Sequence, residues 1–94
     1  MRNLNELTIA KELIQFPSIT PKDAGAIAYL NNKLKKLGFN CKILEFKDKK
    51  SKPIKNLYAR LGKKSPNLCY AGHTDVVPPG NVTDWTVNPF KPTV

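Results

Sequence analysis

The sequence predicts an α/β fold of two amphipathic helices, three short strands and a proline-rich loop, in that order. Apolar residues recur at helical spacing within the first 38 positions. Strand-forming residues then gather in three short runs, which are separated by stretches rich in Lys, Ser, Pro and Gly. From residue 73 onward, four prolines and a glycine leave no room for a regular element.

The first predicted helix covers residues 4–15. Its apolar residues recur at helical spacing and are Leu4, Leu7, Ala10, Leu13 and Ile14. The helix is expected to stop before Phe16-Pro17, because the residue preceding a proline disfavours the helical conformation.

The second predicted helix has start and stop signals of its own. Thr20 is expected to be the N-cap, with Pro21 at the first helical position and Asp23 in the first turn. The apolar stripe that follows is Ile27, Leu30, Leu34 and Leu37. Gly38 is placed to end the helix in a left-handed cap.

The three predicted strands are residues 39–46, 56–61 and 67–72. Cys41 and Cys69 each lie in an apolar strand pattern, which favours buried free thiols over a disulfide framework. Tyr70 is expected in the core with them. Free thiols indicate a reducing compartment, so we expect a cytoplasmic protein.

Composition narrows the classes of partner. The 94 residues carry 16 Lys+Arg against 7 Asp+Glu, a formal charge of +9. Only two of the basic residues are arginines, and the lysines are densest at residues 47–55, around a likely turn, so a solvated surface is favoured over a small nucleic-acid-binding module. No apolar run approaches the roughly 18 residues of a membrane span. Glu6 and Glu12 interrupt any secretory signal. We expect neither a nucleic-acid nor a membrane partner.

The candidate site is the triplet His73-Thr74-Asp75, which holds the only histidine. If the third strand continues into it, His73 and Asp75 share a face about 6.5 Å apart along the backbone. The carboxylate can then hold one imidazole nitrogen and fix the tautomer for a metal at the other. Cys69 lies about 13 Å away along such a strand, too far to bind the same metal. Taken alone, the triplet fits an ordinary surface histidine equally well.

A longer pattern adds to this triplet. "LCYAGHTDVVPPGNVTDWTVNPFKP", preceded by "LIQFPSITP", resembles the zinc-dependent amidohydrolase and exopeptidase family. That family includes succinyl-diaminopimelate desuccinylase, acetylornithine deacetylase, aminoacylase and the glutamate-releasing carboxypeptidases. The resemblance runs through nearly all of the chain in element order. "GHTDVVPPG" followed by Asp-Trp looks closest to the desuccinylase branch, with a deacetylase or an aminoacylase as the alternative.

The resemblance implies roles for individual residues. His73 matches the family's first metal-ligand histidine, and Asp75 matches the catalytic-site aspartate that orients it. The implied cofactor is a pair of Zn²⁺ ions, with Co²⁺ possible in their place. Trp85, Pro89 and Phe90 are expected to pack at the edge of the site. For Ser18 and Thr20, capping of the turn between the helices is the stronger explanation.

The family's other site residues have no match up to Val94. These are an aspartate after a Gly-Arg-Gly segment, which bridges two metals, and a Glu-Glu pair that supplies the general base and a ligand. Residues 1–94 are therefore expected to be the N-terminal part of a mixed-sheet catalytic domain, inactive alone. The alternative is one subunit of a split enzyme. The desuccinylase branch implies a succinylated amino-acid substrate and a full-length homodimer. The family's sheet also places a later strand between the 56–61 and 67–72 strands.

Overall fold

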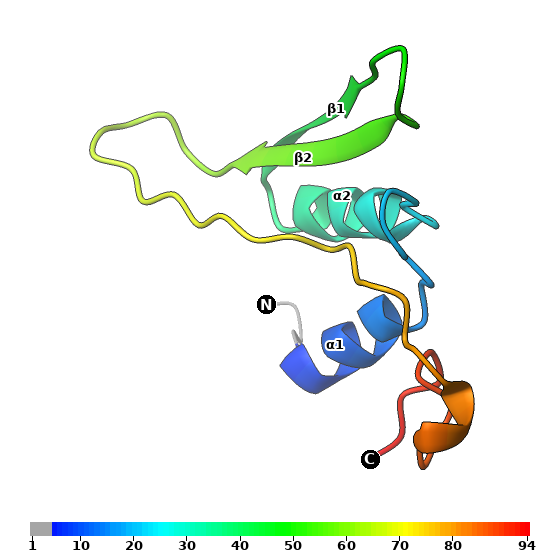
Figure 1. Cartoon of the computed structure of the whole chain (residues 1–94). Helices are drawn as coiled ribbons and strands as arrows, with labels where there is room; N and C mark the ends of the chain where they lie inside the picture. Colours follow the sequence, from blue (N-terminus) through cyan, green and yellow to red (C-terminus); the bar gives the residue numbers. More distant parts are fainter. Residues whose placement is uncertain (1–4) are drawn as a thin grey trace.

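The computed structural model describes residues 5–94, and Figure 1 shows how their elements are arranged. The elements in chain order are α1 (Glu6–Ile14), α2 (Ala26–Lys36), β1 (Asn40–Phe46), β2 (Ile54–Arg60) and a single 3₁₀ turn, η1 (Val82–Asp84). Two helices and a two-stranded antiparallel sheet confirm the predicted α/β class. No helix in the described range is long and apolar enough to cross a membrane.

Helix α1 begins and ends close to the predicted limits. Asn5 is its N-cap, and the Asn5 side-chain oxygen accepts a hydrogen bond of 3.0 Å from the Thr8 amide. The helix ends at Ile14, three residues before Pro17, as expected from the proline. Leu4, the predicted first residue of the apolar stripe, lies outside the described residues.

Helix α2 begins later than predicted, so the assignment of Thr20 as its N-cap was wrong. The N-cap is Gly25, and the carboxylate of Asp23 accepts hydrogen bonds from the amides of Gly25 and Ile27, each at 3.1 Å. The Asp23 side chain thus satisfies two N–H groups at the start of α2, as an acidic residue near a helix start can. The Thr20 amide instead donates to the carbonyl of Val76 at 2.9 Å, beside a single bridge between Ile19 and Val76.

The end of α2 is the one predicted. Gly38 has a φ of +96°, in the region that favours glycine. The Phe39 amide donates to the Leu34 carbonyl and the Gly38 amide to the Lys35 carbonyl, both at 3.0 Å. These two bonds form a Schellman motif, which satisfies the last carbonyl groups of the helix.

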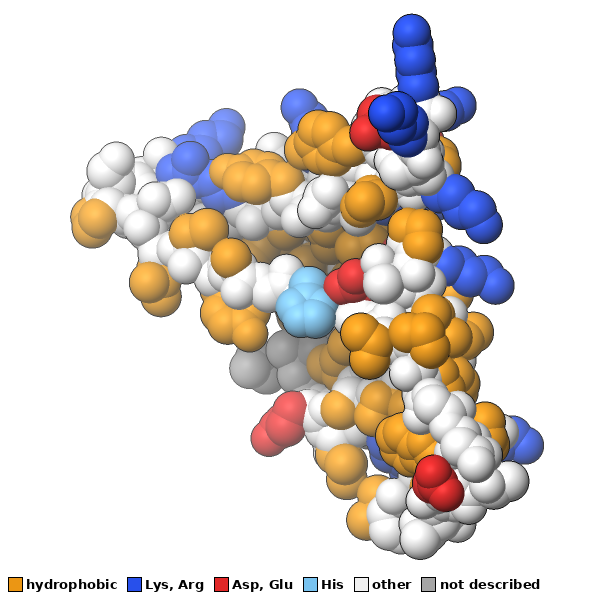
Figure 2. All heavy atoms as spheres, in the orientation of Figure 1, with side chains coloured by type: hydrophobic (Ala, Val, Ile, Leu, Met, Phe, Trp, Pro, Cys, Tyr) orange, Lys and Arg blue, Asp and Glu red, His pale blue; other side chains and the backbone are white. Residues whose placement is uncertain are grey.

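Strands β1 and β2 form a hairpin whose register places Ile43 opposite Leu57. The Asp48 carboxylate shapes the connecting turn by accepting hydrogen bonds from the Lys50 and Ser51 amides at 2.7 and 2.8 Å. These hydrogen bonds hold the pKa of Asp48 below its ordinary value, and the bond from the Lys50 amide has the largest effect. The lysines of this turn are exposed, as predicted, and blue side chains project from that end of the molecule in Figure 2.

The hairpin is covered on one side only. Helix α2 packs against it. Three half-buried strand residues, Cys41, Leu57 and Ala59, share one face of the hairpin, and Cys41 pairs directly with Ala59; Arg60 is the fourth half-buried residue. The alternate positions carry exposed apolar side chains, namely Leu44, Phe46, Ile54 and Tyr58. Among the described residues, only Ala26 and Ile27 are fully buried apolar residues. The apolar core is therefore very small.

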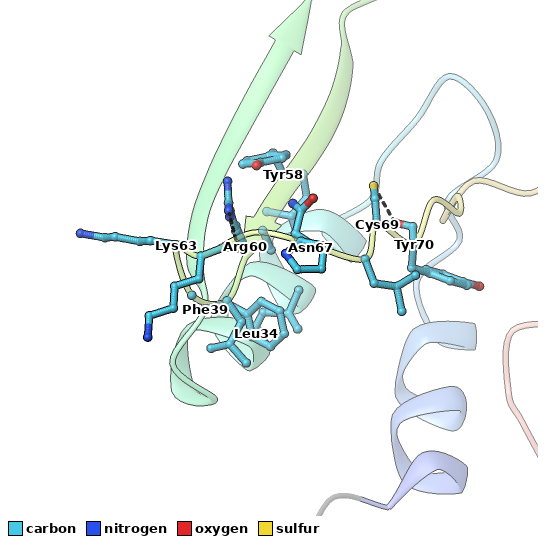
Figure 3. Close-up of a pocket in the computed structure, with 15 residues that line it drawn as sticks. Leu34, Phe39, Tyr58, Arg60, Lys63, Asn67, Cys69 and Tyr70 are labelled. Atoms are coloured by element: carbon cyan, nitrogen blue, oxygen red, sulfur yellow. Dashed lines mark hydrogen bonds between the residues drawn. The ribbon is translucent and has the colours of Figure 1, made fainter.

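The predicted third strand, residues 67–72, is not formed. Leu68 is 98% exposed and Tyr70 is 92% exposed, and Cys69 is an exposed free thiol. The expectation that Cys69 and Tyr70 belong to the core was therefore wrong, whereas Cys41 is a half-buried free thiol. A strand needs a partner for its backbone N–H and C=O groups. In the described part of the chain, residues 67–72 have no such partner, and residues 67–70 line an open cavity of about 950 Å³ together with the end of β2 (Figure 3).

The two helices contact each other through Tyr29. Its hydroxyl donates a hydrogen bond of 2.9 Å to the Glu12 carboxylate, and its ring lies 5.4 Å from that of Phe16. Lys33 reaches the same carboxylate at 3.8 Å. Desolvation by burial, with the Glu12 contact adding to it, raises the pKa of Tyr29 to about 12.

The small core predicts uneven protection against hydrogen exchange. In the isolated chain, amides of α2, β1 and β2 should be protected, and amides of residues 67–72 should exchange as in an unfolded chain, because they have no partners. The free energy of unfolding should be low, only a few kcal/mol at most, and the exposed apolar strand face should promote aggregation. Exchange measured by NMR at each amide tests this. Protection across residues 67–72 with cooperative unfolding of a monomer would contradict it.

Alkaline pH should weaken the contact between the helices. Since folding raises the Tyr29 pKa from 10.0 to about 12, this contact contributes fully to stability below pH 10 and is lost as the pH rises through about 12. Tyr29→Phe removes the hydrogen bond and should lower the free energy of unfolding by about 1 kcal/mol at neutral pH. Denaturation at several pH values measures both effects. Tyr58→Phe, at an exposed strand position, is the matched control.

Candidate functional site

The His73 imidazole and the Asp75 carboxylate form a direct pair. Nδ1 of His73 lies 2.8 Å from Oδ1 of Asp75 and 3.1 Å from the Asp75 backbone carbonyl oxygen. Both partners are acceptors when the carboxylate is ionised, so Nδ1 carries the proton of the neutral ring and Nε2 keeps a free lone pair. The His73 side chain is 82% exposed, and Figure 2 shows the pale blue ring on the surface beside a carboxylate.

The Asp75 carboxylate is held in its ionised form. The hydrogen bond from His73 is the main cause that lowers the pKa of Asp75, and a hydrogen bond with the Thr20 side chain lowers it further. Asp75 therefore remains an acceptor at neutral pH, which maintains the Nδ1–H tautomer of His73. The predicted contact is present, although the segment is not the end of a strand.

A short parallel bridge fixes the position of this pair. Ile19, in the connection between α1 and α2, pairs with Val76. The Val76 amide donates to the Ser18 carbonyl at 3.0 Å, and the Thr20 amide donates to the Val76 carbonyl at 2.9 Å. The connection between the helices thus holds the residue that follows Asp75.

Ser18 contributes to the site in a way that the sequence did not reveal. Its side chain is buried, and its hydroxyl donates a hydrogen bond of 2.9 Å to the carbonyl of Thr74, the residue between His73 and Asp75. We had expected Ser18 and Thr20 to cap a turn, and neither caps α1 or α2. No local pattern signals this contact, because its partners are 56 residues apart.

A groove of about 410 Å³ opens beside the pair. Its lining is both apolar and polar, and comes from α1, the connection between the helices, α2, β2 and residues 73–75, which we call the site segment. Among the lining residues are Leu13, Thr20, Ile27, Leu30 and Asp75. The larger cavity in Figure 3 lies beside β2 and does not include His73.

The loop after the pair is organised by its own hydrogen bonds. The Trp85 indole N–H donates to the Pro79 carbonyl at 3.0 Å, and the Phe90 amide donates to the Asn88 side chain at 2.8 Å. The loop contains η1 and otherwise no regular element, in agreement with its proline content. The packing of Trp85, Pro89 and Phe90 at the edge of a complete site stays a prediction.

Residues 5–94 do not contain a complete metal site. Within that range, no three His, Cys, Asp or Glu side chains are grouped closely enough to hold one ion. Catalytic zinc sites use three protein ligands and structural ones four. Within residues 5–94, the arrangement offers one oriented imidazole with a free Nε2 and no group of ligands around it.

Comparison with known proteins identifies the relatives of this chain. No family model matches it. It is 66% identical over 94 residues to the succinyl-diaminopimelate desuccinylase of Pelagibacter ubique, covering 100% of this chain and 24% of that protein. The enzyme of the same name from Wolbachia pipientis wMel is 53% identical over 91 residues, covering 97% and 22%. The one from Ehrlichia canis is 52% identical over 88 residues, covering 94% and 23%.

The relatives agree with the resemblance found in the sequence. The matches cover nearly all of this chain, including the connection between the helices and the His73–Asp75 segment. The chain spans about a quarter of the length of the curated relatives it matches. By sequence, then, the chain is similar to one segment of the succinyl-diaminopimelate desuccinylases.

Proposed function

We propose that this chain is part of a metal-dependent hydrolase that cleaves the amide bond of N-succinyl-LL-2,6-diaminopimelate. Water is consumed, and the products are succinate and LL-2,6-diaminopimelate. The observation that carries the proposal is the His73–Asp75 pair, with an Nδ1 to Oδ1 distance of 2.8 Å, in a chain 66% identical to an enzyme of that name. His73 and Asp75 are the contribution of this segment to the metal centre.

The chemistry of the pair supports a metal-binding role for His73. Histidines that bind metals commonly donate their second ring N–H to a carboxylate, which fixes the tautomer and raises the basicity of the metal-binding nitrogen. Asp75 accepts that hydrogen bond at Nδ1. Nε2 is consequently the proposed ligand atom, and Asp75 acts by positioning the ring.

The proposed metal is zinc, with cobalt as a possible replacement, since imidazole is a suitable ligand for both. When bound, the metal would supply a Lewis acid that polarises the amide carbonyl and lowers the pKa of a water molecule. The further ligands and the general base are proposed to come from outside residues 5–94, because that range offers no group of three ligands.

The proposal also gives residues 67–72 a structure in the complete domain. We propose that this segment becomes a strand when another strand occupies the space between it and β2. The cavity of about 950 Å³ and the unpaired outer edge of β2 support this arrangement. In Figure 3, Tyr58 and Arg60 mark the β2 side of that space, and Asn67, Cys69 and Tyr70 mark the opposite side.

A chimera tests the proposed function. Residues 1–94 would replace the matching segment of the Pelagibacter ubique enzyme, to which they are 66% identical. The chimera should bind zinc and release succinate from N-succinyl-LL-2,6-diaminopimelate. His73→Ala should abolish activity together with zinc content, because a ligand is lost. Asp75→Ala should lower activity or zinc affinity by about 10- to 100-fold.

The matched control for Asp75→Ala is Asp48→Ala in the hairpin turn. Asp48 is also an exposed carboxylate whose pKa is lowered by hydrogen bonds, but it lies outside the site. Asp48→Ala should leave the zinc content unchanged. A folded chimera whose His73→Ala variant keeps full zinc content would refute the ligand role of His73.

Zinc binding by the 94-residue chain alone should be weak. One imidazole without further ligands cannot form a zinc site of the usual three or four protein ligands. Calorimetry should show the same weak affinity as for an exposed histidine, and no hydrolysis of the substrate should occur. Tight stoichiometric binding that His73→Ala removes would show that this chain builds a site by itself.

A further inference from the structure

We infer that Ser18 is a positioning residue for the His73–Asp75 pair. Its hydroxyl holds the carbonyl of Thr74 and thereby sets the backbone from which both side chains project. The inference rests on the proposed function, in which His73 binds metal and Asp75 orients it. It adds a residue from the connection between α1 and α2 to that site.

Burial gives the Ser18 hydroxyl a defined partner. Ser18 is 2% exposed and is the only buried polar residue in the described part of the chain. A buried hydroxyl without a hydrogen bond is costly, so the bond to Thr74, at 2.9 Å, is strongly favoured. By contrast, the imidazole that this bond helps to position is open to solvent.

Three hydrogen bonds hold the backbone on both sides of Asp75. The Ser18 hydroxyl fixes the Thr74 carbonyl, which precedes Asp75. The amide and carbonyl of Val76, which follows Asp75, bind the Ser18 carbonyl and the Thr20 amide. With the backbone fixed at both neighbours, the Asp75 carboxylate reaches Nδ1 of His73 at 2.8 Å.

Helix capping does not account for Ser18. Helix α1 ends at Ile14 with Gln15 as its C-cap, and the Asp23 carboxylate accepts the hydrogen bonds at the start of α2. The hydroxyl of Ser18 makes its hydrogen bond with the site segment instead. Thr20 supports the same segment through the hydrogen bond from its amide to the Val76 carbonyl.

The single histidine allows a direct measurement. Long-range ¹⁵N NMR of the full chain at about pH 8.5, where an ordinary histidine is neutral, reports the ratio of the two imidazole tautomers. The unmodified chain should favour Nδ1–H. Ser18→Ala should lower the Nδ1–H to Nε2–H ratio about fivefold, the effect of losing roughly one net hydrogen bond. Ser18→Thr, which keeps the hydroxyl, should restore the ratio.

The matched control is Ser51→Ala, which removes a hydroxyl bonded to Asp48 in the hairpin turn. It should leave the tautomer ratio unchanged. In each variant, amide contacts between Ile19 and Val76 report whether the parallel bridge is intact. If the bridge opens in Ser18→Ala, the comparison is made in Ser18→Cys, which keeps the volume and weakens the hydrogen bond. An unchanged ratio with an intact bridge overturns the inference.

Asp75→Asn separates this inference from the proposed function. It should reduce the Nδ1–H preference, because an amide accepts less strongly than a carboxylate. If Asp75→Asn changes the ratio and Ser18→Ala does not, Ser18 has no positioning role and the proposed function stands. If Asp75→Asn has no effect either, the orienting role of Asp75 fails, and the inference fails with it.

Discussion

The candidate site depends on the parallel bridge between residues 18–20 and 74–76. Without it, the segment that carries His73 would be an exposed loop after an unpaired stretch, since residues 67–72 pair with no strand in the described part of the chain. Two backbone hydrogen bonds and the buried hydroxyl of Ser18 hold it against the connection between the helices. Helix α2 and the hairpin provide the rigid body from which this connection extends.

Local chemistry made some elements predictable. The apolar stripe, the proline after α1 and the glycine after α2 place the helices, because each acts through neighbours in the sequence. The hairpin follows from two strand-forming runs around a lysine-rich turn. Within the site, the contact between His73 and Asp75 was also predictable, since their separation is only two residues.

Partners that are distant or absent account for the wrong predictions. Thr20 is a residue type common at helix N-caps, but its amide donates a hydrogen bond to the Val76 carbonyl. The carboxylate of Asp23 caps α2 instead. Residues 67–72 have the composition of a strand, but a strand forms only where another backbone satisfies its N–H and C=O groups. The role of Ser18 required knowledge of a carbonyl in another part of the fold.

The span of 56 residues between Ser18 and Thr74 has a consequence for the order of folding. Closing a long loop costs conformational entropy that grows with the logarithm of its length. The turns of α2 and the pairing of β1 with β2 close much shorter loops, so they can form without that cost. The hydrogen bond between Ser18 and Thr74, and the bridge beside it, can therefore form readily only after the helix and hairpin between these residues have brought the two ends of that loop together.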